Sequence, residues 1–129
     1  MSKTALEKLG WKVGAAAYVV GRPDGLDAVP DSQAAEPELV LAFVGAVAEV
    51  GPRLAEALPL YRRGDRLWFA YPKKTGAIRT DLHRDHGWEP LRAAGLVAVT
   101  QVAIDDTWSA LRFRYRDEVA NLTRAGEQG

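Results

Sequence analysis

The sequence contains no cysteine and no excess of charge of either sign. Without cysteine among its 129 residues, the chain can form no disulfide, thiolate metal site or cysteine nucleophile. Its 17 Lys and Arg residues are balanced by 17 Asp and Glu residues, whereas nucleic-acid-binding domains usually carry a basic excess. The composition therefore argues against nucleic acid as a partner.

Long apolar runs are also missing. No run approaches the length that spans a membrane, and no basic region followed by an apolar stretch opens the chain, so we expect a cytoplasmic protein without a membrane partner. Hydrophobic residues still make up 47% of the sequence, which is enough for a packed core. The length predicts one α/β domain over residues 1–116, followed by a polar tail or short helix over 117–129.

Short apolar segments predict the strands. The clearest is Leu67–Tyr71, five apolar residues between Gly64-Asp65 and Pro72, which is typical of a strand buried on both faces. In the last segment apolar residues alternate with arginines, which predicts a strand with one wet face. The predicted strands cover residues 15–20, 39–44, 67–71, 96–104 and 108–115.

Helices are predicted between these strands. Thr4 and Glu7 have the spacing of a capping box, and Gly10 can end the helix that it starts. A second helix is expected with Pro52 in its first turn, and a third from Thr80 or Asp81 to Ala94 with a break near Gly87 and Pro90. The stretch 26–36 can hold only a short helix or irregular turns, because Pro30 and Pro37 interrupt it.

Alternation of strands and helices predicts a parallel sheet, and the closing hairpin adds one antiparallel strand. Right-handed crossovers would put all three connections on one face, so the other face needs a cover: the N-terminal helix, the tail or a second subunit. The first strand is an expected edge without charge, and such edges pair with other chains. This predicts a homodimer; the alternative is that the two termini alone cover both features.

Four segments of the chain form a recognisable combination: Gly21–Gly25, Leu67–Lys73, Thr80-Asp81 and Ala103–Phe113, of which Asp105–Phe113 is the most specific. Together they resemble a small uncharacterised bacterial family, a domain of unknown function found largely in actinobacteria. The resemblance extends from about Leu9 to Tyr115 and implies no established activity.

The closing strand, hairpin and antiparallel strand are similar in topology to the second half of a class I methyltransferase sheet. The resemblance implies a Rossmann-like sheet in the order 1-2-3-5-4, with strand five antiparallel. Such enzymes carry a glycine-rich loop after strand one and an acid on the next strand. Here the loop contains Pro23, and the next strand ends in Phe43-Val44-Gly45, so no cofactor is expected.

Polar residues gather where the parallel strands are expected to end, the edge at which open α/β sheets bind ligands. Cations there could hold an anionic, nucleotide-like small molecule near a helix N-terminus, with carboxylates orienting them. The alternative is that these are ordinary turn and cap residues. The candidate residues are Arg22, Asp24, Lys73, Lys74, Arg79, Asp81, Asp105, Asp106 and Trp108.

Other constellations are weaker. His83 and His86 could share a helix face with Asp81 and Asp85 beside them, but solvated histidines explain the pattern better, and no metal is predicted. The alternating Arg112, Arg114 and Arg116 could bind a phosphate backbone, yet zero net charge favours an ordinary solvated face. No nucleophile–histidine–acid set is readable.

The sequence thus leaves two functions open. The first is a non-catalytic Rossmann-like module for interaction or self-association. The second is a binder or enzyme that acts on an anionic, nucleotide-like small molecule at the carboxyl edge of the sheet. No residue has an assigned catalytic role.

Overall fold

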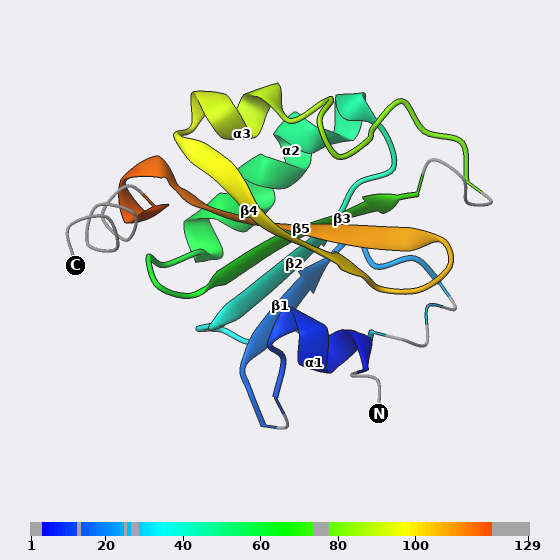
Figure 1. Ribbon diagram of the computed structural model, residues 1–129. Helices are drawn as coiled ribbons and strands as arrows, with labels where there is room; N and C mark the ends of the chain where they lie inside the picture. The colour runs from blue at the N-terminus through cyan, green and yellow to red at the C-terminus, as the bar shows by residue number, and fades with distance from the viewer. Residues whose placement is uncertain (1–3, 13, 25, 27–28, 74–77, 120–129) are drawn as a thin grey trace, which may run out of the picture.

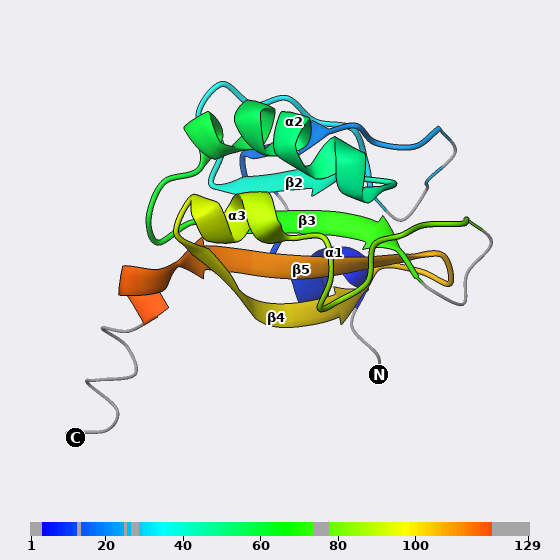
Figure 2. The same cartoon turned by 90° about the horizontal axis from the view of Figure 1, so that it is seen from above.

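The computed structural model describes residues 4–12, 14–24, 26, 29–73 and 78–119. Its centre is a five-stranded sheet with helices on both faces (Figures 1 and 2). Along the chain the elements are α1 (Ala5–Leu9), β1 (Ala17–Val20), β2 (Leu39–Phe43), α2 (Val47–Ala57), the 3-10 helix η1 (Leu58–Leu60), β3 (Arg66–Pro72), α3 (Glu89–Ala93), β4 (Leu96–Ala103) and β5 (Trp108–Tyr115).

The strand order is β1-β2-β3-β5-β4. β1, β2 and β3 run parallel, and β5 lies antiparallel between β3 and β4. The short turn after β4 forces this antiparallel step, because two strands joined by a few residues can only fold back on one another. The predicted α/β class, strand order and direction of the fifth strand are confirmed.

One core lies between the sheet and the helices α2 and α3. Alternate residues of β3, Leu67 and Phe69, point into it together with Val40 of β2 and Leu111 and Phe113 of β5. From α2, the spacing of Val50, Leu54 and Ala57 places all three on the buried side of the helix. This is the larger of the two described cores, and Figure 2 shows both helices over this face.

The opposite face carries a second core beneath α1. Trp68 and Ala70 of β3 pack there with Leu41 and Phe43 of β2, and Leu9 of α1 is fully buried against them. The indole N–H of Trp68 donates to the backbone oxygen of Leu9 over 2.9 Å, which fixes the helix to the middle of the sheet. The N-terminal helix therefore covers part of the second face, and this explains why β2 and β3 are apolar on both sides.

The connection from β1 to β2 departs from the expected arrangement. Leu26 and Val29 pack into the core beneath α1, on the face opposite α2. The expectation that all three connections lie on one face is wrong for this first one, because its described residues, interrupted by prolines, form no crossover helix. At residue 26 and over residues 29–36, the part of the stretch that the structure describes, the chain is irregular, as one of the two expectations had it.

The helix α2 begins at Val47, which places Pro52 in its second turn. Pro52 is exposed, so its ring and the carbonyl that it leaves unbonded face solvent, where water can satisfy that carbonyl. The prediction that Pro52 lies in the first turn of this helix is therefore wrong.

The predicted helix from Thr80 or Asp81 to Ala94 is mostly absent. Residues 78–88 form turns, with a backbone bridge between His83 and His86, and only Glu89–Ala93 is helical. Gly87 has a φ of +102°, a value that breaks a right-handed helix and favours glycine. No helix in the described part of the chain is long and apolar enough to cross a membrane.

Candidate functional site

The loops at the carboxyl ends of the strands do meet at one edge. The backbone N–H of Lys73, just after β3, donates to the carbonyl of Thr107 in the β4–β5 turn over 2.7 Å. Val44, just after β2, donates to the carbonyl of Ala70 in β3 over 2.9 Å. The predicted convergence of the Lys73 and Asp105 segments is thus present in the fold.

Two of the candidate ligand-binding residues, Asp105 and Trp108, stabilise the β4–β5 turn and its packing. The Asp105 carboxylate accepts from the backbone N–H groups of Thr107 and Trp108 over 2.8 and 2.7 Å, which holds the turn closed. Trp108 is buried and meets Phe43 edge-to-face, with ring centroids 5.2 Å apart. Both side chains are engaged by the protein itself.

Arg22 is likewise occupied. Its guanidinium donates to the carbonyls of Val29 and Leu26 over 2.5 and 2.6 Å, and so anchors the loop after β1. Asp24, Arg79 and Asp106 are exposed, and the Lys73 side chain is half-buried. Lys74 lies outside the described residues. The ligand site at this edge stays a prediction, carried by the side chains that the fold leaves unengaged.

The N-terminus of α2 also opens at this edge, and the chain's own carboxylates occupy it. Asp81 accepts from the backbone N–H of Val47 over 2.8 Å, and Glu49 accepts from that of Gly45 over 3.0 Å. A helix N-terminus attracts anions because its first N–H groups are unbonded and its dipole is positive. Two negative side chains there oppose the binding of an anionic ligand at the same place.

The two histidines stack on one another outside any helix. The rings of His83 and His86 lie 5.3 Å apart between centroids, and the backbone N–H of Asp85 donates to Nδ1 of His83 over 3.3 Å. Among the described residues no group of three or more His, Asp and Glu side chains could hold a metal ion. The weak metal pattern of the sequence therefore corresponds to a turn.

The three arginines of the β5 segment, Arg112, Arg114 and Arg116, lie in different surroundings. Arg112 donates to the carbonyl of Asp65 over 3.2 Å, and Arg114 lies 3.5 Å from Glu118. Burial, together with the charges of Arg114 and Arg66, lowers the pKa of Arg112 below its usual value. Arg116 is exposed and begins a helical turn after β5, so the three arginines do not form one wet stripe.

Glu118 ties this helical turn to the rest of the domain. Its carboxylate accepts from the Tyr61 hydroxyl over 2.7 Å and from the backbone N–H groups of Gly64 and Tyr115 over 2.9 Å each. Burial alone would raise the pKa of Glu118, but these hydrogen bonds and the charge of Arg114 lower it overall. Burial and the same hydrogen bond raise the pKa of the Tyr61 hydroxyl.

The β1 edge of the sheet is protected. Val19 donates to the carbonyl of Ser32 over 2.8 Å, and Ala34 donates to the carbonyl of Ala17 over 2.9 Å. Residues 32–34 thus run along β1 and occupy its outer hydrogen-bonding groups. The prediction that β1 lies at an edge is confirmed, but this segment already pairs with part of that edge.

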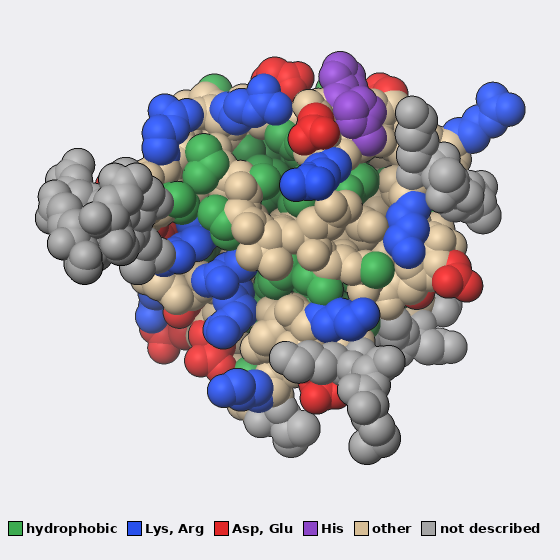
Figure 3. Space-filling view, in the orientation of Figure 1, with side chains coloured by type: hydrophobic (Ala, Val, Ile, Leu, Met, Phe, Trp, Pro, Cys, Tyr) green, Lys and Arg blue, Asp and Glu red, His purple; other side chains and the backbone are tan. Residues whose placement is uncertain are grey.

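The opposite edge, formed by β4, is open. β4 pairs with β5 on one side, and no described residue hydrogen-bonds to its other side. Its eight residues, Leu96–Ala103, include no charge and no proline, the two features that most often keep an edge strand from pairing. Figure 3 faces this edge and shows an uncharged band along β4.

A bulge divides the open edge. The pairing with β5 shifts between Ala98 and Thr100, so Val99 is the extra residue, and 38% of its surface is exposed. The predicted order 1-2-3-5-4 already makes strand four an edge. The missing charge in residues 96–103 is therefore a sequence signal for an open edge at the fourth strand.

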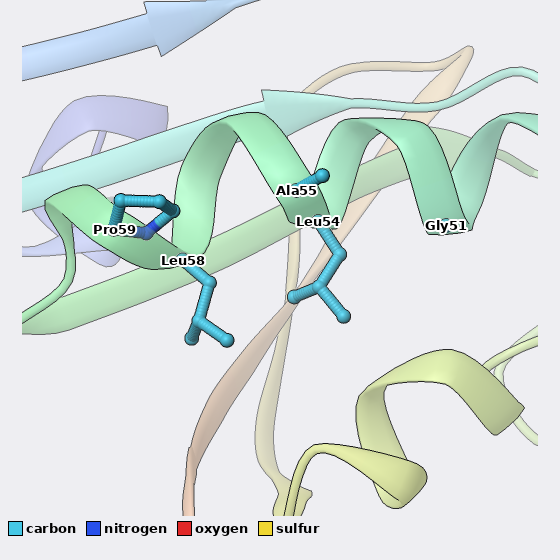
Figure 4. Close-up of a pocket in the computed structure, with 5 residues that line it drawn as sticks. All are labelled: Gly51, Leu54, Ala55, Leu58 and Pro59. Atoms are coloured by element: carbon cyan, nitrogen blue, oxygen red, sulfur yellow. The ribbon is translucent and has the colours of Figure 1, made fainter.

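A shallow apolar hollow lies on α2. It has a volume of about 420 Å³ and is lined by Gly51, Leu54, Ala55, Leu58 and Pro59. Figure 4 shows the Leu54 and Leu58 side chains projecting on the same side of the helix. Leu54 is itself buried and Leu58 is half-buried, so the hollow exposes only part of each side chain.

No family model matches the chain, and no curated protein matches it. Among solved structures, one similar chain is the crystal structure of the B. subtilis M1A22 tRNA methyltransferase TrmK, at 17% sequence identity and a TM-score of 0.43. The match covers 89% of this chain but 44% of that one, so this chain spans less than half of the neighbour's length. A likeness of this degree carries no argument about activity.

Proposed function

We propose that this domain is a non-catalytic interaction module that assembles as a homodimer through β4. The observation that carries the proposal is the open edge: eight uncharged residues whose outer N–H and C=O groups are free of the described chain. A second β4 can satisfy these groups by extending the sheet, as an added strand does in many complexes.

The charges at the two ends of β4 favour a second copy as the partner. Arg92 and Arg116 lie near its amino end, where the N–H of Arg116 donates to the carbonyl of Gly95 over 2.7 Å. Asp105 and Asp106 lie just beyond its carboxyl end, after Ile104. Antiparallel pairing of two β4 strands brings the basic end of each copy to the acidic end of the other, which favours this arrangement electrostatically.

The bulge fits the same arrangement. A two-fold axis beside Val99 would pair residues 96–98 of one copy with 100–102 of the other, on both sides of the axis. The exposed Val99 side chains would then lie close to each other at the centre. A substitution of Val99 would therefore change both halves of the interface at its centre.

Cross-linking tests the proposal cleanly because the natural chain has no cysteine. Val99→Cys should give a disulfide-linked dimer under mild oxidation, since a symmetric contact brings the two introduced thiols together. Ile78→Cys is the matched control, because Ile78 is an equally exposed large hydrophobic residue, at 39%, outside β4. Equal cross-linking of the two variants, or none at Val99→Cys, would contradict pairing through β4.

A further inference from the structure

A groove between α3 and β4 combines an apolar floor with a basic rim. Its volume is about 220 Å³, and its floor includes Trp88, Leu96 and Phe113. Its rim carries Arg84, Arg92 and Arg116, with Asp85 as the single acid that lines it. Figure 3 shows hydrophobic side chains over α3 and the start of β4 with Lys and Arg around them.

The rim arginines differ from most other described arginines because their guanidinium groups have no hydrogen-bond or ion-pair partner among the described residues. Arg53, Arg63 and Arg114 each form an ion pair with a carboxylate. By contrast, the guanidinium groups of the three rim arginines form no hydrogen bond or ion pair with the described residues, although the backbones of Arg92 and Arg116 do form hydrogen bonds. Three arginines and one aspartate line the groove, which leaves it with an excess of positive charge.

The floor and the volume indicate what such a cation cluster would hold. An apolar cavity of about 150 Å³ can accommodate a benzene ring, so 220 Å³ leaves room for one ring and a small acidic group. Trp88 and Phe113 lie 5.5 Å apart between ring centroids, and aromatic floors favour aromatic ligands. Guanidinium groups bind carboxylates through paired hydrogen bonds.

We infer that this groove binds a small aromatic carboxylate, with the ring on the apolar floor and the carboxylate among Arg84, Arg92 and Arg116. The groove is complete within one chain, but the proposed dimer sets Arg92 and Arg116 against Asp105 and Asp106 of a second copy, so we expect the monomer to bind the carboxylate more tightly. Asp85 stands on the rim as a repulsive neighbour for the carboxylate and limits the ligand to a single negative group.

Amide NMR tests this with benzoate as the probe. Benzoate should shift the Trp88 indole N–H and the amides of Val97 and Ala98, which line the groove. Acetate, which lacks the ring, and benzyl alcohol, which lacks the charge, should each shift these signals far less at the same concentration. Equal shifts with benzyl alcohol, or no shift with benzoate, would overturn the inference.

Substitution of the rim arginines provides a second test of the inference. Arg92→Gln and Arg116→Gln should each weaken benzoate binding by about tenfold, the loss expected for a charge-assisted hydrogen bond. Arg79→Gln is the control, because Arg79 is exposed and lies outside the groove. The NMR spectrum itself reports whether each variant is folded. Repeating the titration in Val99→Lys, which is expected to be monomeric, shows whether benzoate binding in the groove needs the dimer. Unchanged benzoate affinity in both Arg92→Gln and Arg116→Gln would overturn the inference.

Discussion

The Asp81 carboxylate accepts a hydrogen bond from the backbone N–H of Val47 over 2.8 Å, although the two residues are 34 positions apart. The bond satisfies an N–H group of the first turn of α2 and sets a negative charge against the positive end of the helix dipole. A residue that the sequence offers as a ligand or a local cap therefore joins the turns before α3 to a different helix.

Removal of this long-range cap should destabilise the domain. We expect Asp81→Ala to lower the free energy of unfolding by about 1 kcal/mol, the usual cost of losing a helix cap. Urea denaturation followed by far-UV circular dichroism measures the difference. Asp106→Ala is the control, since Asp106 is exposed and should change stability by less than about 0.5 kcal/mol. Equal stability of the two variants would show that the Asp81 contact contributes nothing.

Glu118 should make stability depend on acidic pH. Its pKa in the folded protein lies below the ordinary value of 4.5, so its contribution is fully present above that value and is lost as pH falls through the folded pKa. Unfolding free energies measured from about pH 6 to about pH 3 should therefore fall less steeply in Glu118→Gln than in the wild type. Glu56→Gln, at an exposed ion pair, should keep the wild-type slope.

Nucleotides and phosphate should leave the melting temperature unchanged. The reason is that Asp81 and Glu49 already occupy the N-terminus of α2, and Arg22 is held by its own loop. Lys73→Ala should melt like the wild type, whereas Asp105→Ala should be less stable by about 1 to 2 kcal/mol because two N–H groups lose their acceptor. A clear rise in melting temperature with ATP, S-adenosylmethionine or phosphate, removed by Lys73→Ala, would instead favour the ligand site at the carboxyl edge.

Opposite charges at the ends of β4 should contribute to assembly. Arg116→Asp alone and Asp106→Arg alone should each weaken the dimer, because each places like charges together across the interface. The double variant should regain part of the affinity, and added salt should reduce all of these differences. Sedimentation equilibrium measures the dissociation constants. If the double variant is as weak as the sum of the two singles, the ends of β4 do not meet.

Signals that act within a few residues were readable from the sequence. The capping box forms as predicted: Thr4 Oγ1 accepts from the N–H of Glu7 over 3.2 Å, and Glu7 accepts from the N–H of Thr4 over 3.0 Å. The apolar segments become strands, and the short β4–β5 turn gives the antiparallel step. The order 1-2-3-5-4, by contrast, was implied by the topological resemblance to a methyltransferase sheet and is confirmed by the structure.

Contacts between distant segments were not readable. The sequence gives no sign that Asp81 caps α2 or that residues 32–34 pair with β1, because both depend on where irregular loops run. The same limit applies to the groove beside α3. Its rim combines Arg84, Arg92 and Arg116 from three separate segments, and only the folded chain brings them around one apolar floor.

The molar mass in solution tests pairing through β4 most directly. Light scattering coupled to size exclusion should give twice the chain mass of 14.1 kDa for the wild type at micromolar concentration. Val99→Lys should shift the protein to the monomer, because two lysines would meet near the axis, while Ile78→Lys should leave the dimer intact. A monomeric wild type, or a Val99→Lys variant that remains as dimeric as Ile78→Lys, would contradict the account.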